Sequence, residues 1–221
     1  RVIRLRTQSG LKAAELATIA GVHVRTIEGW LRETYPAIAA RAKAEGAAIH
    51  WADETAVKED AHWIRGFAPA GRTPVLEMPA RWGKLSMISA ITNRGEISFQ
   101  IVEGTINAER FIEFLAHLLE DATAKVFLIV DNLRVHHAKI VRDWAEPLKD
   151  KIELFYLPPY APESNPDEHL NHDFKTSLRL EPASDNDNDL MQKAMRIMKR
   201  IAQIPGRVQS YFQHPLAAYA A

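Results

Sequence analysis

Three acidic residues stand at positions where a sheet protein would bring carboxylates together. Asp53 follows the apolar run 47–52, Asp131 follows the stronger apolar run 126–130, and Glu168 follows the turn-rich stretch 158–166. Carboxylates at the ends of buried strands, with a third at a helix start, can converge and hold divalent metal ions. Two such ions about 4 Å apart clamp a phosphodiester for in-line displacement. The pattern therefore indicates a nuclease or a strand-transfer enzyme.

Each of these acids also has a purely structural interpretation. An aspartate after a strand commonly serves as a turn or cap residue. Asn165, Pro166 and Glu168 fit the N-cap, N1 and N3 positions of a helix, so the glutamate can simply complete a capping box. For each residue taken alone, both interpretations stay open. The ordered set of three favours the metal site.

The residues around the acids resemble a known family. Trp51 to Glu54, Val130 to His137 and Asn165 to Glu168 are similar to the three catalytic blocks of the DDE transposases. More narrowly, they resemble the bacterial insertion-sequence branch of the mariner-like superfamily, insertion sequence family six-thirty. Asp131 and Glu168 leave 36 residues between them, close to the spacing of that superfamily.

The resemblance implies a function. Asp53, Asp131 and Glu168 would be the catalytic residues and would bind two Mg²⁺ or Mn²⁺ ions, with Asn132 and His136 as accessory residues. One of His136 and His137 would contact the scissile phosphate. The partners would be DNA, as terminal inverted repeats and target, and a second copy of the chain in a homodimer. The location would be the bacterial cytoplasm, at the nucleoid.

The composition is that of an ordinary globular chain. Its 221 residues are 47% apolar and 25% charged, enough for one domain of ordinary size and a small one. The absence of cysteine excludes disulfides and thiolate metal sites. No apolar run is long enough for a membrane span. The net charge is zero, but residues 1–47 hold eight Lys and Arg against four Asp and Glu, an excess that suits a DNA-binding segment.

The first 46 residues have a helical pattern. Residues 12–20 predict one helix, Gly21 ends it, and residues 23–32 predict a second, which together form a helix-turn-helix pattern. The second helix would enter the major groove with His23, Arg25 and Thr26 facing the DNA. A plain helical hairpin remains the alternative. A further helix is predicted over 35–45.

From residue 47 the pattern predicts an α/β domain. Strands are expected over 47–53, 62–65, 85–92, 97–102, 125–130 and 152–157, and helices over 108–119, 137–149, 166–178 and 190–203. Strands followed by strand–helix alternation give a mixed sheet flanked by helices, and the resemblance implies a ribonuclease H-like fold. We therefore divide the chain into a helix-turn-helix element with a linker helix, 1–46, and a catalytic domain, 47–221. On the helix 190–203, Lys193, Arg196, Lys199 and Arg200 are expected to face outward, toward solvent or a phosphate backbone.

Two features depart from the family pattern. Its members carry two helix-turn-helix modules where one is visible here, and Ser164 stands where the third block usually has leucine. A chain shortened in its DNA-binding part would bind its ends less well. The alternative function is therefore a catalytically decayed transposase that represses from the terminal repeats. A general ribonuclease H-type nuclease is disfavoured by the helix-turn-helix pattern.

Overall fold

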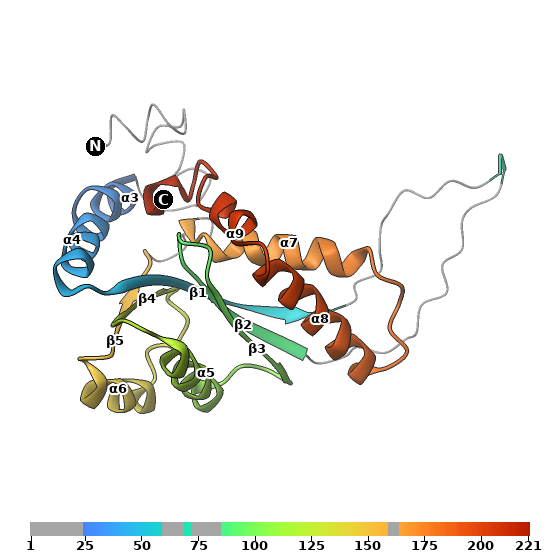
Figure 1. Ribbon diagram of the computed structural model, residues 1–221, viewed down its shortest axis with the longest axis horizontal. Helices are drawn as coiled ribbons and strands as arrows, with labels where there is room; N and C mark the ends of the chain where they lie inside the picture. The colour runs from blue at the N-terminus through green and yellow to red at the C-terminus, as the bar shows by residue number, and fades with distance from the viewer. Residues whose placement is uncertain (1–23, 59–68, 72–84, 159–163) are drawn as a thin grey trace.

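The fold is centred on a five-stranded mixed sheet. The computed structural model describes residues 24–58, 69–71, 85–158 and 164–221, and in this part the strand order is β3-β2-β1-β4-β5 (Figure 1). The strands are β1 (Ala48–Val57), β2 (Leu85–Ile91), β3 (Ile97–Glu103), β4 (Val126–Val130) and β5 (Ile152–Tyr156). β2 is antiparallel to β1 and β3, whereas β4 is parallel to both β1 and β5.

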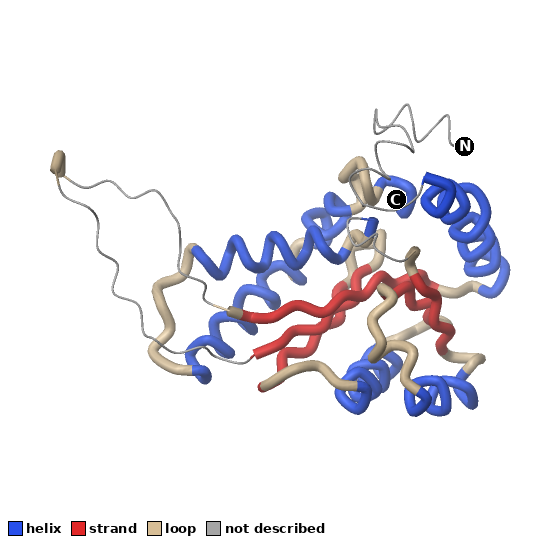
Figure 2. The backbone as a smooth tube through the Cα atoms, turned by 180° about the vertical axis from the view of Figure 1, so that it is seen from behind, coloured by secondary structure: helices blue, strands red, loops and turns tan. Residues whose placement is uncertain are grey.

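Helices cover both faces of this sheet. One face carries α5 (Ala108–Asp121), α6 (Lys139–Ala145) and the short 3₁₀ helix η2 (Glu146–Leu148); the other carries α7 (Asp167–Arg179), α8 (Asp187–Ala202) and α9 (Pro205–Tyr211). Figure 2 shows the same layers from behind. The alternation of side chains along β4 explains how it serves both layers. Phe127 and Ile129 belong to the core under α7 and α8, and Val126, Leu128 and Val130 belong to the core under α5.

The N-terminal helix is one continuous run with a widened turn. It comprises α3 (Val24–Gly29), the π-helical turn η1 (Trp30–Thr34) and α4 (Tyr35–Glu45). Pro36 explains the wide turn, because proline has no N–H and its ring would collide with the carbonyl four residues earlier. The amide of Tyr35 instead donates to the carbonyl of Trp30, five residues back. The two predicted helices, 23–32 and 35–45, are therefore joined.

Most of the predicted elements are confirmed. The hairpin of β2 and β3, the buried strand β4 and the helices α5, α7 and α8 lie within a few residues of their predicted bounds. The first predicted helix, 12–20, its turn at Gly21 and the predicted strand 62–65 lie outside the described residues. α9 and the final 3₁₀ helix η4 (Ala218–Ala220) were not predicted. Within the described part of the chain, every helix is too short or too polar to cross a bilayer.

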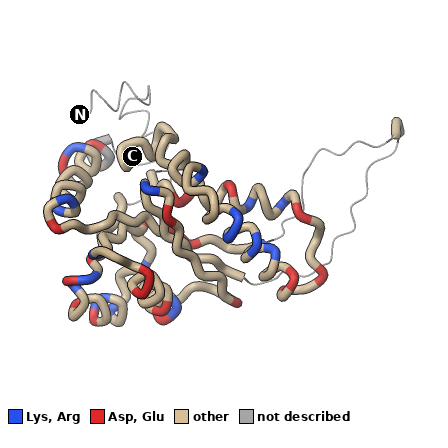
Figure 3. The backbone as a smooth tube through the Cα atoms, in the orientation of Figure 1, with Lys and Arg blue, Asp and Glu red and all other residues tan. Residues whose placement is uncertain are grey.

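One surface prediction was wrong. Arg196, Lys199 and Arg200 are exposed on α8, where Figure 3 shows a band of basic residues. Lys193 is buried instead, and its Nζ donates to the carbonyls of Pro182 and Ala183 at 2.9 and 3.1 Å. The turn before α8 exposes carbonyls that need donors, and a long lysine side chain can reach back to them.

Candidate active site

Asp53 and Asp131 lie side by side because their strands are parallel neighbours in matched register. Trp51 of β1 pairs with Ile129 of β4, so each aspartate lies two residues beyond the same paired position. β4 ends at Val130, which leaves Asp131 at the carboxyl edge, and β1 continues to Val57 as the partner of β2. Both aspartates are half-buried.

Glu168 lies in the first turn of α7, and Asn165 attaches that turn to β1. The side chain of Asn165 donates to the carbonyl of Ala52 at 2.9 Å and accepts from the amide of Asp167 at 3.1 Å. In a capping box, the side-chain oxygen of Asn165 would accept from the amide of Glu168. Here the Glu168 amide donates instead to the backbone carbonyl of Asn165, at 3.2 Å. The helix start is thus fixed beside the residue that precedes Asp53.

The pKa of Asp53 responds to the charges of the other two acids. Burial raises the pKa of Asp53 to about 8, together with the nearby charges of Glu168 and Asp131 and against hydrogen bonds from the Glu54 amide and Asn171. The three predicted acids therefore lie within electrostatic reach of one another. Among the described residues, however, no three His, Cys, Asp or Glu side chains already converge as a metal cage.

A fourth acid, Asp167, lies beneath this site and was not predicted. It is fully buried and accepts a hydrogen bond from Ser89 Oγ at 2.7 Å, and Ser89 is the β2 residue paired with Asp53. Burial raises the pKa of Asp167 well above its ordinary value, and the charge of Asp53 adds to the effect. The sequence held one signal for this buried acid: Asp167 and Glu168 are adjacent at a helix start, and only one of two successive helix residues can face the site.

Asn171 is a second residue that the sequence did not single out for this site. It lies one turn after Glu168 on α7, is 1% exposed, and donates from Nδ2 to Asp53 Oδ2 at 2.7 Å. The prediction that Leu170, Phe174 and Leu178 form the packed stripe of this helix is confirmed.

The two histidines after Asp131 lie in different environments. His136 is 1% exposed, with Nδ1 3.0 Å from Asp131 Oδ1 and Nε2 3.2 Å from Glu54 Oε1. Burial alone would lower the pKa of His136, but hydrogen bonds to Asp131 and Glu54 outweigh it and raise the pKa to about 9. His137 is exposed, stacks on Tyr156 and lies 2.9 Å from Asn132 Oδ1. Of the two, only His137 is exposed, and the phosphate contact of one of them stays a prediction.

Asn132 connects the segment that follows β4 with the segment that follows β5. Its Nδ2 donates to the carbonyl of Leu157, which follows β5, while its Oδ1 faces His137. It therefore ties the segment after β4 to the segment after β5.

The residues predicted to read DNA are only partly described. Thr26 is exposed on α3. His23 and the side chain of Arg25 lie outside the described part of the structure, so their role stays a prediction.

Comparison with known proteins identifies the family. Residues 48–191, well over half of the chain, match the model of the DDE superfamily endonucleases. The chain belongs to this family. Among curated proteins, none matches the sequence.

Solved structures of the Mos1 mariner transposase share the fold of this endonuclease. The sequence of Mos1 in its paired-end complex with Mn is 17% identical to this chain, and the two structures superpose with a TM-score of 0.55 over 99% of this chain and 78% of the Mos1 chain. Its catalytic domain with raltegravir and Mg is also 17% identical, with a TM-score of 0.52 over 90% and 98% of the two chains. The predicted ribonuclease H-like fold, a mixed sheet flanked by helices, is confirmed.

Proposed function

We propose that this DDE endonuclease is a transposase that cleaves DNA and transfers the freed strand, with Asp53, Asp131 and Glu168 as its catalytic residues. The proposal is supported by the matched register of Asp53 and Asp131 and by the charge of Glu168 acting on Asp53. A structural cap or turn residue has no need of two other carboxylates nearby. Their mutual repulsion costs stability, which is typical of a functional site.

A divalent cation fits this site by donor chemistry and by charge. The three ligands offer only carboxylate oxygens, which suit Mg²⁺ or Mn²⁺. A cation would offset the burial and the carboxylate repulsion that together raise the pKa of Asp53. Because the described side chains do not yet form a closed cage, binding requires rotation of the carboxylates. Mos1 structures with Mn and with Mg are known, and we propose two ions for this chain too. Bound there, they would lower the pKa of the attacking water and stabilise charge on the leaving oxygen.

The proposed reaction has two steps at one site. In the first, water attacks a phosphodiester, a new P–O bond forms, and the bond to the 3′ oxygen breaks; the water gives up a proton, the leaving oxygen takes one up, and the products are a 3′-OH and a 5′-phosphate. In the second, that 3′-OH attacks a phosphodiester of target DNA and displaces its 3′ oxygen. The chain's own residues hold the carboxylates in place: Asn171 holds Asp53, and Asn165 fixes the helix that carries Glu168.

DNA recognition and assembly complete the proposal. The carboxylates would read only phosphate geometry, so we assign recognition of terminal inverted repeats to the helix-turn-helix residues His23, Arg25 and Thr26. Mos1 forms a paired-end complex, and we propose a homodimer that holds two ends of a bacterial insertion sequence of family six-thirty. Residues 1–46 and 47–221 are proposed as the recognition and catalytic parts.

Nicking of supercoiled plasmid DNA tests the enzyme directly. We expect cleavage that requires Mg²⁺ or Mn²⁺, is abolished by EDTA, and is lost in Asp53→Asn, Asp131→Asn and Glu168→Gln. The matched control is Asp150→Asn, which removes an exposed carboxylate just before β5, at the edge of the sheet opposite to Asp131. It should cleave at the wild-type rate.

The nicking assay also distinguishes an active transposase from the alternative, a decayed transposase that acts as a repressor. If the wild type binds repeat DNA but shows no metal-dependent nicking, the protein is a decayed transposase that acts as a repressor. If Asp131→Asn nicks as fast as the wild type, the assignment of the catalytic residues is wrong.

A further inference from the structure

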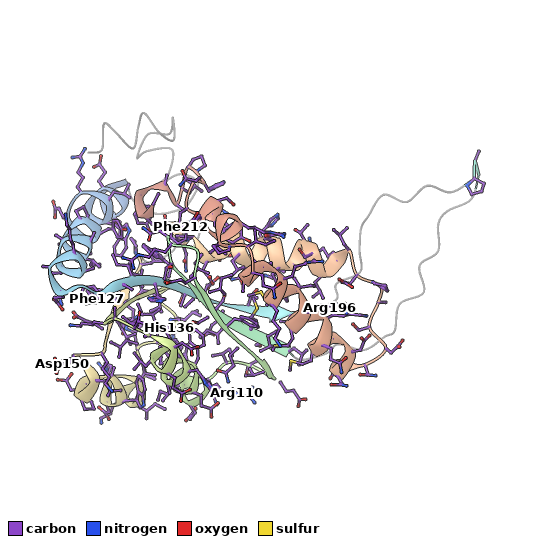
Figure 4. The ribbon with its side chains drawn as sticks, in the orientation of Figure 1. Arg110, Phe127, His136, Asp150, Arg196 and Phe212 are labelled. Carbon is purple, nitrogen blue, oxygen red and sulfur yellow. The ribbon has the colours of Figure 1, made fainter. Side chains whose placement is uncertain are left out.

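His136 joins the two central strands from beneath the catalytic face. Its Nδ1 lies 3.0 Å from Asp131 Oδ1 and 3.1 Å from the Asp131 carbonyl, while Nε2 lies 3.2 Å from Glu54 Oε1. The ring also packs on Phe111 of α5, with the ring centroids 4.5 Å apart. Figure 4 shows it between the sheet and that helix. The imidazole is thus fixed on three sides.

Glu54 faces the opposite side of the sheet from Asp53. Successive residues of a strand alternate between faces, so Asp53 meets Asn171 of α7 while Glu54 meets His136 on the α5 side. Glu54 is therefore not a fourth member of the carboxylate group. It is the acceptor that holds the far end of the His136 ring, with only 14% of its side chain exposed.

These contacts select one oxygen of Asp131 for the site. Oδ1 is 3.1 Å from the amide of Leu133 and 3.0 Å from His136 Nδ1. No hydrogen bond to Oδ2 is found among the described residues, so this oxygen is available to a metal ion. A free aspartate would rotate between several rotamers.

We propose that Glu54 and His136 form a positioning pair that holds Asp131 in the rotamer needed to bind metal. The inference rests on the proposed function, because Asp131 is taken there as a metal ligand. It assigns no contact with DNA to either residue. Partners that orient metal ligands typically contribute 10–100-fold to metal affinity.

Two amide substitutions separate positioning from mere burial. The side-chain nitrogen of asparagine can take the place of Nδ1, and that of glutamine the place of Nε2. His136→Asn therefore keeps a donor to Asp131 and loses Glu54, whereas His136→Gln keeps a donor to Glu54 and loses Asp131. Each variant loses one contact to a carboxylate, so a similar fall in thermal stability is expected for both.

Metal affinity and one amide resonance give the decisive comparison. By Mn²⁺ titration calorimetry we expect His136→Gln to bind about 10–100-fold more weakly than the wild type, and His136→Asn to stay within about threefold. Without metal, the amide of Leu133, which donates to the same Oδ1, reports on the carboxylate. Both variants lose the ring current of the imidazole, so the Leu133 resonance should differ between them, with His136→Gln showing a further shift that His136→Asn lacks. For the other partner, Glu54→Leu frees the imidazole ring to turn its Nδ1 away from Asp131, so it should weaken Mn²⁺ binding as His136→Gln does. The short asparagine side chain of His136→Asn reaches only Asp131 and needs no partner at a far end. Glu54→Gln, which keeps an acceptor, should behave like the wild type.

The two proposals fail differently. Equal weakening in His136→Asn and His136→Gln, or the same Leu133 resonance in both variants, would overturn the positioning pair even if the wild type cleaves DNA. A wild type that neither binds Mn²⁺ nor cleaves would overturn the proposed function, and the Leu133 resonance would still decide whether His136 holds Asp131.

Discussion

Asn171 Nδ2 lies 2.7 Å from Asp53 Oδ2, which joins the first turns of α7 to the central strand. This hydrogen bond lowers the pKa of Asp53, against burial and the charge of Glu168, which raise it. It also orients one carboxylate oxygen. Asn171 therefore supports a carboxylate that its surroundings otherwise disfavour.

Replacement of Asn171 by leucine should weaken catalysis without unfolding the protein. Leucine keeps the branched shape but cannot donate to Asp53, so we expect metal-dependent nicking to fall about 10–100-fold. Thr176→Ala, an exposed substitution on the same helix, serves as the control and should leave the rate unchanged. If Asn171→Leu nicks DNA at the wild-type rate and binds metal with the wild-type affinity, the hydrogen bond is only structural.

Gly95 should be indispensable for stability. It has φ +94° in the β2–β3 turn, and a Cβ there would lie 2.6 Å from the carbonyl oxygen of Pro205 at the start of α9. Gly95→Ala therefore combines a strained backbone, about 1–3 kcal/mol, with a collision against rigid backbone. Gly206→Ala is the control, since nothing lies within 4 Å of its added Cβ and alanine favours a helix.

Denaturant unfolding measures both variants. We expect Gly95→Ala to lower the free energy of unfolding by more than about 2 kcal/mol. Gly206→Ala should match or slightly exceed the wild type. Equal stabilities would mean that the turn and α9 separate easily.

The contact of α7 with α9 should give a stability contribution that depends on pH. Asp173 accepts from Arg207 Nε and Nη2 at 2.7 and 2.6 Å, and from the Tyr211 hydroxyl. Burial alone would raise the pKa of Asp173, but these hydrogen bonds outweigh it and lower the pKa. A lowered folded-state pKa stabilises the protein above the unfolded value of about 3.9, and this stability is lost as pH falls through the folded value.

Asp173→Asn tests this linkage. At pH 7 the substitution should cost about 1.5–3 kcal/mol, the usual contribution of hydrogen bonds to a charged group. Denaturant unfolding at a series of pH values measures the difference in the free energy of unfolding between wild type and variant. This difference should narrow once the pH falls below about 4. Asp143→Asn removes an exposed carboxylate paired with Lys139 and should show a small gap at all pH values. A gap for Asp173→Asn that stays constant down to pH 3 would contradict the assigned pKa shift.

The sheet could be predicted because its signals are local. β4 is continuously apolar, as a strand covered on both faces must be, and the turn at Asn93 to Gly95 marks the hairpin. The three acids stood out by their positions after apolar runs and at a helix start, and the family resemblance implied their catalytic role. The register that aligns Asp53 with Asp131 is a pairing between distant segments, and neither apolar run specifies it alone.

The unpredicted features all depend on tertiary contacts. α9 is only seven residues long and begins at Pro205, too short for a clear periodic pattern. Asn171 and Asp167 acquire a role only because α7 lies across β1 and β2. Burial of Lys193 depends on carbonyls of the preceding turn, which no helical periodicity can reveal.

The N-terminal helix and the catalytic domain should unfold together. Trp30 is 4% exposed and belongs to the same core as Trp51, Phe174 and Phe212. Its ring centroid lies 6.5 Å from that of Tyr219, whose hydroxyl donates at 2.9 Å to the carbonyl of Ser164, just before α7. The helix therefore contributes to the packing behind the strand that carries Asp53.

Trp30→Ala should destabilise the whole protein by about 3–5 kcal/mol, because it removes a large buried side chain from this shared core. Arg32→Ala is the control on the same helix, since the exposed Arg32 makes only a 3.6 Å ion pair with Glu28 and should cost less than about 1 kcal/mol. Chemical unfolding should be followed by tryptophan fluorescence and by the amide exchange of β4. One shared transition that shifts in Trp30→Ala would mean that the helix folds as part of the catalytic unit. Unchanged stability of β4 in this variant would instead support an independent N-terminal element that ends near residue 46.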